Sequence, residues 1–378
     1  MKELKFHGKS IIIGENSIEY IKNIDFKRVF IVTGGRSMFE NGAIDKLMSI
    51  LKEKSAEVHI FKGVNKNPTT EVVKLGVEEM KKFNPDTVIG IGGGSPIDAA
   101  KSMALFYEYD LDIEKVEGIT LPQVRYKTKF IAVPSTSGTG TEVTRASVIT
   151  YKDKDIKIGL KSDAFIPDYA ILDSTLTYSM PKEVVAETGM DALTHAVECY
   201  INKNIDEFTE VLAEGAVKGI FKYLVLSYNG DKKARDKVHK YQCMAGCAFS
   251  NVGLGMAHGI SHAIGGKYNL SHGLLNAICL PYVLKYNSRD FEVDQRLNYL
   301  ASLIGSDSFI NSVIDLNKSL NIPLSFKDLG IDENDFFENI EEITSNSLKG
   351  STRVNPVKVS FDEMKNILKC IFYGDMGL

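Results

Sequence analysis

The chain has 378 residues, which exceeds the size of one ordinary hydrophobic core and favours two domains. Hydrophobic residues make up 44% and charged residues 25%, as is usual for soluble globular proteins. The formal net charge of −4 offers no basic field for nucleic acid or an anionic membrane. No apolar run approaches the roughly 20 residues of a membrane span, and the N-terminus shows no signal-peptide pattern. We therefore expect a cytoplasmic protein.

In chain order, short β-rich runs alternate with helical runs over the first half of the sequence. Strands are predicted at 28–33, 57–63, 86–94 and 129–136, with helices at 43–55, 72–83 and 97–107. This alternation predicts a parallel sheet with helices on both faces. Residues 147–162 then predict a β-hairpin with a charged turn.

The pattern becomes helical near residue 180. Pro181 opens a run of helix-type periodicity that extends through residue 230, and helical segments with short polar breaks continue to the C-terminus. We therefore predict an α/β domain over 1–179 and an all-helical domain over 180–378.

The stretch 89–101 combines an apolar strand, three glycines and a predicted helix start. The glycines allow a tight turn and a close approach of the backbone to a ligand. Ser95 is a suitable N-cap, Pro96 fits the first helical position, and Asp98 lies three residues after the cap. The free N–H groups of such a helix start form an anion site, for which a dinucleotide pyrophosphate is a natural occupant. The stretch matches neither GxGxxG nor a P-loop, so a strand–helix turn without a ligand is an equal alternative.

A second loop, 134–142, is rich in hydroxyls and glycines and also follows a predicted strand. It could wrap the nicotinamide side of a dinucleotide, or it could be a flexible connector. Two such loops at strand ends of one sheet support each other, because ligands bind at those ends.

Candidate metal ligands lie in the second half. Asp191 and His195 are four residues apart, which places both on one helical face. Three of the seven histidines fall within fifteen residues, namely His258, His262 and His272. The glycine pair that follows His262 is expected to break the helix and to let the chain turn back. Imidazoles with one carboxylate suit Zn²⁺ or Fe²⁺ rather than Ca²⁺ or Mg²⁺. The residues alone leave open which histidines bind the ion.

Together these motifs resemble the iron-containing (group III) alcohol dehydrogenase family over almost the whole chain. The motifs are NPT (67–69), GGGSPID (92–98), PSTSGTGTE (134–142), GMDALTHAVE (189–198), MAHGISHAIGG (256–266) and SHG (271–273).

The resemblance implies an N-terminal Rossmann-like dinucleotide-binding domain, an all-α metal-binding domain, and an active site in the cleft between them, as in the dehydroquinate synthase-like fold. It implies that one divalent metal, Fe²⁺ first and Zn²⁺ as the alternative, is bound by Asp191, His195, His258 and His272. His262 would be a catalytic neighbour that relays a proton or positions the substrate. The implied cofactor-binding residues are Gly34, Gly35, Asn67, Gly92, Gly93, Gly94, Ser95, Asp98, Ser135, Thr136, Thr139 and Lys157.

One position departs from the NAD-using members of this family, which often carry an aspartate directly after the first strand of the dinucleotide fold. Here that position is Gly34, followed by Gly35, Arg36 and Ser37. No carboxylate would repel a 2′-phosphate, and the arginine or serine could receive it. We expect NADP(H) to be preferred over NAD(H), with loose selectivity as the alternative.

The expected reaction interconverts a primary alcohol and its aldehyde by hydride transfer, with the metal acting as a Lewis acid. Dehydrogenation of a short hydroxy acid or a diol, such as 4-hydroxybutyrate or 1,3-propanediol, is an alternative. A dehydroquinate synthase-like lyase would need a basic substrate pocket, whereas the metal motifs are surrounded by small and apolar residues. A glycerol dehydrogenase-like zinc enzyme would use two histidines, and a non-catalytic nucleotide-binding module would need no metal set. We expect a homodimer or larger homo-oligomer.

Overall fold

The structure, a computed structural model, describes residues 2–115, 120–151 and 156–377. The chain divides into two compact units, one up to Met180 and one from Pro181 onward. The charged turn predicted within the hairpin, at 152–155, lies outside the described residues. Among the described residues, no helix combines the length and the apolar character that crossing a membrane requires.

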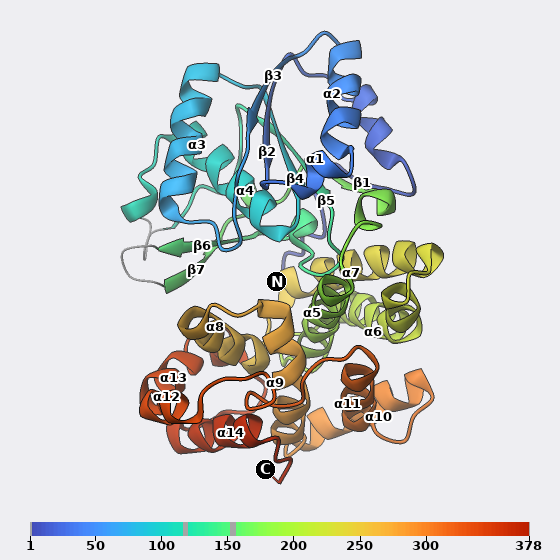
Figure 1. The fold of residues 1–378 in the computed structure, drawn as a ribbon, viewed down its shortest axis with the longest axis vertical. Coiled ribbons are helices and arrows are strands. Elements are labelled where there is room, and N and C mark those ends of the chain that lie inside the picture. Colours follow the sequence, from blue (N-terminus) through green and yellow to red (C-terminus); the bar gives the residue numbers. More distant parts are fainter. Residues whose placement is uncertain (1, 116–119, 152–155, 378) are drawn as a thin grey trace. The chain divides into compact units, whose positions relative to one another are not determined.

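A six-stranded sheet forms the centre of the first unit, and its strands run in the order β1-β8-β5-β4-β2-β3. Figure 1 labels each of these strands except β8. Every neighbouring pair is parallel, which confirms the predicted parallel sheet. The strands are β1 (Ser10–Ile13), β2 (Arg28–Thr33), β3 (Glu57–Phe61), β4 (Thr87–Gly92), β5 (Lys129–Pro134) and β8 (Tyr169–Leu172). The sequence did not predict β1 and β8, which have four residues each.

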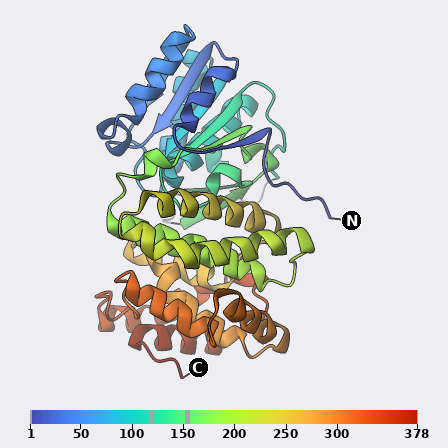
Figure 2. The same cartoon turned by 90° about the vertical axis from the view of Figure 1, so that its right-hand side faces the viewer.

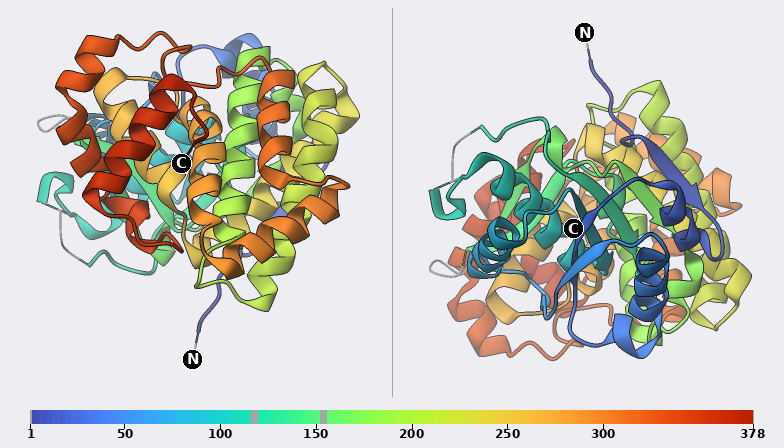
Figure 3. Two further views of the ribbon diagram at one scale, coloured as in Figure 1. Left: turned by 90° about the horizontal axis from the view of Figure 1, so that it is seen from below. Right: turned by 90° about the horizontal axis from the view of Figure 1, so that it is seen from above.

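Helices cover both faces of this sheet, as Figure 3 (right) shows. They are α1 (Ser37–Glu40), α2 (Ala43–Glu53), α3 (Thr70–Phe83) and α4 (Gly94–Tyr109), with short 3₁₀ turns at Ser17–Asn23, Ile113–Lys115, Thr141–Val143, Asp163–Phe165 and Ser174–Thr177. Successive strand residues point to opposite faces. Phe30 therefore packs in the core with α3 and α4, whereas Val29 and Ile31 pack in the core with α2.

The predicted hairpin is present as a separate antiparallel pair, β6 (Ala146–Tyr151) and β7 (Ile156–Lys161). The hairpin contacts the loop before α3, where the Thr150 N–H donates to the Pro68 carbonyl oxygen at 2.8 Å.

Every regular element described in the second unit is a helix. These are α5 (Lys182–Tyr200), α6 (Glu207–Tyr228), α7 (Lys232–Val252), α8 (Met256–Tyr268), α9 (His272–Asn287), α10 (Phe291–Ile304), α11 (Phe309–Ser319), α12 (Glu333–Glu338), α13 (Ile340–Ser347), a 3₁₀ turn at Gly350–Val354, and α14 (Phe361–Tyr373). Figure 2 shows α6, in yellow-green, lying beside α7, in darker yellow. Helix α5 packs against α6, α7 and α9 and is buried along most of its length. A helix that is buried on several sides carries apolar side chains on nearly all of its faces, and its buried polar side chains have a structural or chemical role.

Two local predictions were wrong. Helix α4 begins at Gly94 with Gly93 as its N-cap, so Ser95 lies inside the first turn rather than at the cap. Helix α8 continues through the glycine pair 265–266 and ends at Tyr268, and the C-cap residue Asn269 adopts a left-handed backbone conformation with φ of 51°. A glycine in a helix interior costs only about 1 kcal/mol, and the packing of α8 against α9 and α13 outweighs this.

Candidate metal centre and cofactor loops

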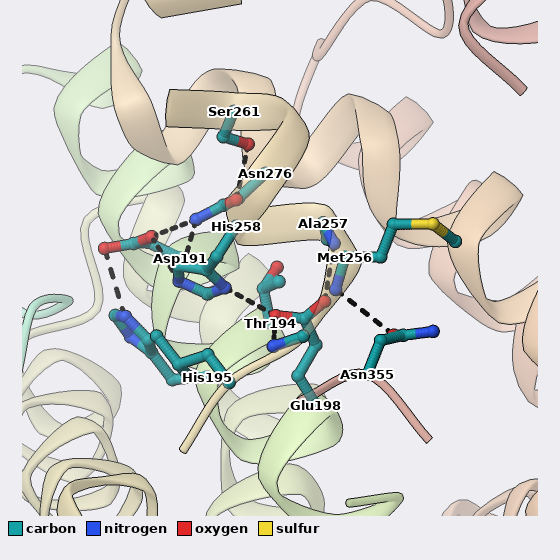
Figure 4. Close-up of polar contacts among 12 residues, drawn as sticks. Asp191, Thr194, His195, Glu198, Met256, Ala257, His258, Ser261, Asn276 and Asn355 are labelled. Atoms are coloured by element: carbon teal, nitrogen blue, oxygen red, sulfur yellow. Dashed lines mark hydrogen bonds and ion pairs between the residues drawn. The ribbon is translucent and has the colours of Figure 1, made fainter. Parts of the chain in front are cut away.

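Three buried side chains from two helices form the tightest group of candidate ligands. Asp191 and His195 lie one turn apart on α5, and the Asp191 Oδ2 is 4.0 Å from the His195 Nδ1. His258, on α8, places its Nε2 4.0 Å from the Asp191 Oδ1. One donor atom from each of the three residues lies within 4.8 Å of the others. Figure 4 shows the three side chains converging.

A fourth candidate ligand comes from the start of α9. The His272 Nε2 is 3.8 Å from the Asp191 Oδ1, and the His272 ring lies 5.2 Å from the ring of His258. The His272 side chain is 29% exposed, in contrast to the buried ligands on α5 and α8. The short loop after Asn269, rather than a break at the glycines, turns the chain and presents this histidine.

His262 lies beside this group. It is one turn along α8 from His258, and its ring stacks on the His272 ring at a centroid distance of 4.7 Å. Its ring is 6.3 Å from that of His258. The structure therefore brings together all five residues that the sequence singled out in this half of the chain.

The electrostatics of the group suit metal binding. Burial lowers the pKa of His258 well below its usual range, and the neighbouring imidazoles of His195, His272 and His262 lower it further. His258 is therefore neutral at neutral pH, and a neutral imidazole has the lone pair that a metal requires. Imidazole nitrogens with one carboxylate are a donor set that fits Fe²⁺ or Zn²⁺.

Glu198 and Asn276 are residues that sequence reasoning missed, and both make polar contacts with candidate ligands. Glu198 places its Oε2 2.6 Å from the Nδ1 of His258, and both side chains are buried. Burial raises the pKa of Glu198 to about 7, although the hydrogen bonds that its carboxylate accepts from backbone N–H groups oppose this rise. Spacing could have pointed to Glu198, because it follows His195 by three residues on the same helix.

The second missed residue is Asn276 on α9, one turn after His272. Its Nδ2 donates to the Asp191 Oδ1 at 2.7 Å and lies 3.1 Å and 3.2 Å from the Nε2 atoms of His258 and His272. Its Oδ1 accepts from the Ser261 hydroxyl at 2.5 Å, which fixes the orientation of the amide. Asn276 thus contacts the same donor atoms that a metal ion would use.

In the first unit, the two predicted cofactor loops touch each other at the carboxyl ends of β4 and β5. The strands are paired up to Gly92 and Pro134, and the Ser135 N–H donates to the Gly92 carbonyl oxygen at 2.8 Å. A Cβ atom on Gly94 would lie only 2.8 Å from the Thr139 Cγ2. A Cβ on Gly93 would lie 3.5 Å from the side chain of Thr136. These glycines allow the two loops to approach each other closely. A ligand site at the carboxyl ends of parallel strands requires such a close approach.

Asp98 contacts protein groups rather than open space. Its Oδ1 accepts from the Thr141 hydroxyl at 2.5 Å, and its Oδ2 accepts from the Val148 N–H at 3.1 Å. The carboxylate therefore links α4 to the second loop and to β6. One turn further along, the buried Lys101 donates to the Thr144 and Ala146 carbonyl oxygens at 2.8 Å and 2.9 Å.

The remaining predicted cofactor residues flank these loops. Gly34 and Gly35 follow β2, whose Thr33 is paired with Ile91 of the parallel strand β4. All three loops therefore begin at the carboxyl end of the sheet. Asn67 has a left-handed backbone with φ of 57°. Lys157 lies opposite Thr150 in the hairpin. Thr150 forms an isolated β-bridge with Thr69, and its N–H donates to the Pro68 carbonyl oxygen, so both contacts are with the residues directly after Asn67. Burial lowers the pKa of Lys157.

Comparison with known proteins agrees with this geometry. Residues 8–174 match the model of the iron-containing alcohol dehydrogenase family, and residues 185–372 match its C-terminal family. An NADPH-dependent butanol dehydrogenase of Clostridium saccharobutylicum is 43% identical over 97% of each chain, and an alcohol dehydrogenase of Thermococcus barophilus is 37% identical over 96% of this chain and 97% of that one. The iron-containing alcohol dehydrogenase structure from Thermococcus thioreducens superposes with a TM-score of 0.91, 33% identity, and coverage of 99% of this chain and 100% of that one. The chain therefore belongs to the iron-containing alcohol dehydrogenase family.

Proposed function

We propose that this oxidoreductase interconverts a primary alcohol and its aldehyde, with one divalent metal bound by Asp191, His195, His258 and His272. The convergence of one carboxylate and three imidazoles from α5, α8 and α9 supports this ligand set. Fe²⁺ is the metal that the family favours, and Zn²⁺ fits the same donors. When bound, such a cation acts as a Lewis acid toward an alcohol or carbonyl oxygen.

The chain's own residues have separate roles in this proposal. Burial keeps His258 neutral, so it binds metal without first losing a proton. His262 is partly exposed and stacks on His272, which places it to carry a proton between the substrate oxygen and solvent. The two glycine and hydroxyl loops at the ends of β4 and β5 would hold the dinucleotide.

The metal assignment is tested by His258→Ala and His272→Ala, with His262→Ala as the matched neighbour. We expect the first two variants to lose both metal and turnover, measured by elemental analysis and an aldehyde-dependent assay after anaerobic reconstitution with Fe²⁺ or Zn²⁺. The His262→Ala variant should retain the metal while its pH–rate profile changes. An active, metal-free His258→Ala protein would refute the ligand set.

We further propose that NADPH is preferred over NADH. Gly34 and Gly35 leave no carboxylate after β2 to repel a 2′-phosphate, and Arg36 and Ser37 are exposed there. The relative at 43% identity is named for NADPH dependence. The ratio of kcat/KM for the two cofactors decides this, and equal or better use of NADH would contradict it.

The substrate is proposed as a short, apolar primary aldehyde or alcohol. Relatives named for butanol and for 1-propanol support this, while a structural neighbour is a 1,3-propanediol oxidoreductase with 30% identity and a TM-score of 0.91. A panel of butanal, propanal, 3-hydroxypropanal and succinic semialdehyde would separate aldehyde, diol and hydroxy-acid specificity. We also propose a cytoplasmic homo-oligomer, which light scattering after size exclusion and cell fractionation would test.

A further inference from the structure

Glu198 is a buried carboxylate that contacts a candidate metal ligand and lies outside the proposed ligand set. It lies on α5, seven residues after Asp191, and its side chain is 1% exposed. Its Oε2 is 2.6 Å from the His258 Nδ1, while the Nε2 on the other side of that ring faces Asp191 (Figure 4). The carboxylate and the candidate metal position are therefore on opposite sides of one imidazole.

The same carboxylate also holds the backbone that carries this histidine. Its Oε1 accepts from the Ala257 N–H at 2.6 Å, and its Oε2 accepts from the Gly255 N–H at 2.9 Å. These N–H groups belong to the start of α8, where a helix leaves its first donors without partners inside the helix. Glu198 therefore fixes both the start of α8 and the ring of His258.

Hydrogen-bond chemistry determines what this contact does to the imidazole. An ionised carboxylate can only accept hydrogen bonds, and both oxygens of Glu198 accept from backbone N–H groups, so beside the carboxylate form the His258 Nδ1 is the donor. A neutral imidazole protonated at Nδ1 has its lone pair on Nε2, the atom that faces Asp191. The opposite tautomer would place a hydrogen on Nε2, where the metal should bind.

We propose that Glu198 is a positioning residue that locks His258 in the Nδ1–H tautomer and presents the Nε2 lone pair to the metal. This inference rests on the proposed ligand set. Partners of this kind in the second layer around metal sites change metal affinity by about 10- to 100-fold when they are removed.

The experiment uses Glu198→Gln, with Asn355→Ala as the matched control. Asn355 also holds the start of α8, because its Oδ1 accepts from the Met256 N–H at 3.2 Å, but no contact described for it reaches a candidate ligand. Zn²⁺ affinity is measured by chelator competition on the full-length apo-protein at pH 8. We expect Glu198→Gln to weaken Zn²⁺ binding by about 10- to 100-fold and Asn355→Ala to leave it unchanged.

A tautomer measurement separates positioning from general loosening of the helix. Nitrogen chemical shifts of ¹⁵N-histidine-labelled apo-protein report which ring nitrogen of His258 carries the proton, with His258→Ala providing the assignment. The wild type should show protonated Nδ1, and Glu198→Gln should lose that state, because a carboxamide can donate to Nδ1 and push the proton to Nε2.

A second variant covers the case in which Glu198→Gln does not fold. A Cβ on Gly255 would lie 2.8 Å from the Glu198 Oε1, so Gly255→Ala displaces the carboxylate without removing it and should also weaken Zn²⁺ binding. Wild-type affinity and tautomer in Glu198→Gln, or in Gly255→Ala if the former does not fold, would overturn the inference. Equal losses in Asn355→Ala would do so too. If His258→Ala itself keeps full Zn²⁺ affinity, the proposed ligand set fails instead.

Discussion

Substitution of Gly273 tests whether the spacing of α5 and α9 sets the metal site. Gly273 directly follows His272 and is buried against α5. A Cβ atom there would lie 2.3 Å from the Glu187 backbone oxygen and 3.2 Å from the Asp191 Cβ. A backbone oxygen cannot rotate away, so Gly273→Ala must move the helices apart by about 1 Å to reach ordinary contact, with an overpacking cost of about 1–3 kcal/mol.

That displacement acts on two candidate ligands at once, because it separates His272 from Asp191. Metal–ligand distances tolerate shifts of only about 0.2 Å, so we expect Gly273→Ala to lose metal on dialysis and to lose turnover in proportion. The assays are elemental analysis, thermal unfolding of the apo-protein and aldehyde-dependent NADPH oxidation.

The matched control is Gly266→Ala, an exposed position inside α8 with no atom within 4 Å of the added Cβ. It should retain metal and gain about 0.5–1 kcal/mol of stability, as alanine does over glycine within a helix. Full metal content and turnover in Gly273→Ala would refute the reasoning, because the ligands would then not depend on this helix contact.

Two further predictions concern the first unit. Gly94→Ala should raise KM for the cofactor with a smaller effect on kcat, because its Cβ would press on Thr139 and part the two loops; unchanged cofactor KM would count against a dinucleotide site there. Burial lowers the pKa of Lys101 from 10.5 to about 8, so between these pH values the unfolded chain binds more protons than the folded one. Wild-type stability should therefore rise relative to Lys101→Met from pH 8 to 10.5, by at most about 3 kcal/mol at roughly 1.4 kcal/mol per pH unit. Urea denaturation measures this, and a pH-independent difference would contradict it.

The sequence was sufficient for four of the six strands of the sheet, β2, β3, β4 and β5, because these are short apolar runs between amphipathic helices. An apolar run of this kind can be recognised in the sequence without knowing which strands lie beside it. Strands β1 and β8 escaped prediction because four residues are too few for a period to be recognised. Their place in the sheet depends on backbone pairing with each other and with β5.

The helical repeat grouped most of the candidate ligands in the sequence, whereas the resemblance to the iron-containing alcohol dehydrogenases selected the four and added His272. Asp191 and His195 on one helix, and His258 and His262 on another, are related by the helical repeat, which is a local property. The continuation of α8 through its glycines was misjudged because packing against α9 and α13 overrides the weak preferences of single residues. Helix α4 begins two residues earlier than expected, at Gly94.

Only the tertiary structure decided how the site is held together. Glu198 reaches His258 across 60 residues of sequence, and Asn276 reaches Asp191 across 85. No local spacing relates residues on different helices, so contacts of this kind depend on how α5, α8 and α9 pack. The sequence determined which side chains could bind a metal, and the packing of these three helices determined which donors face one another and which partners hold them.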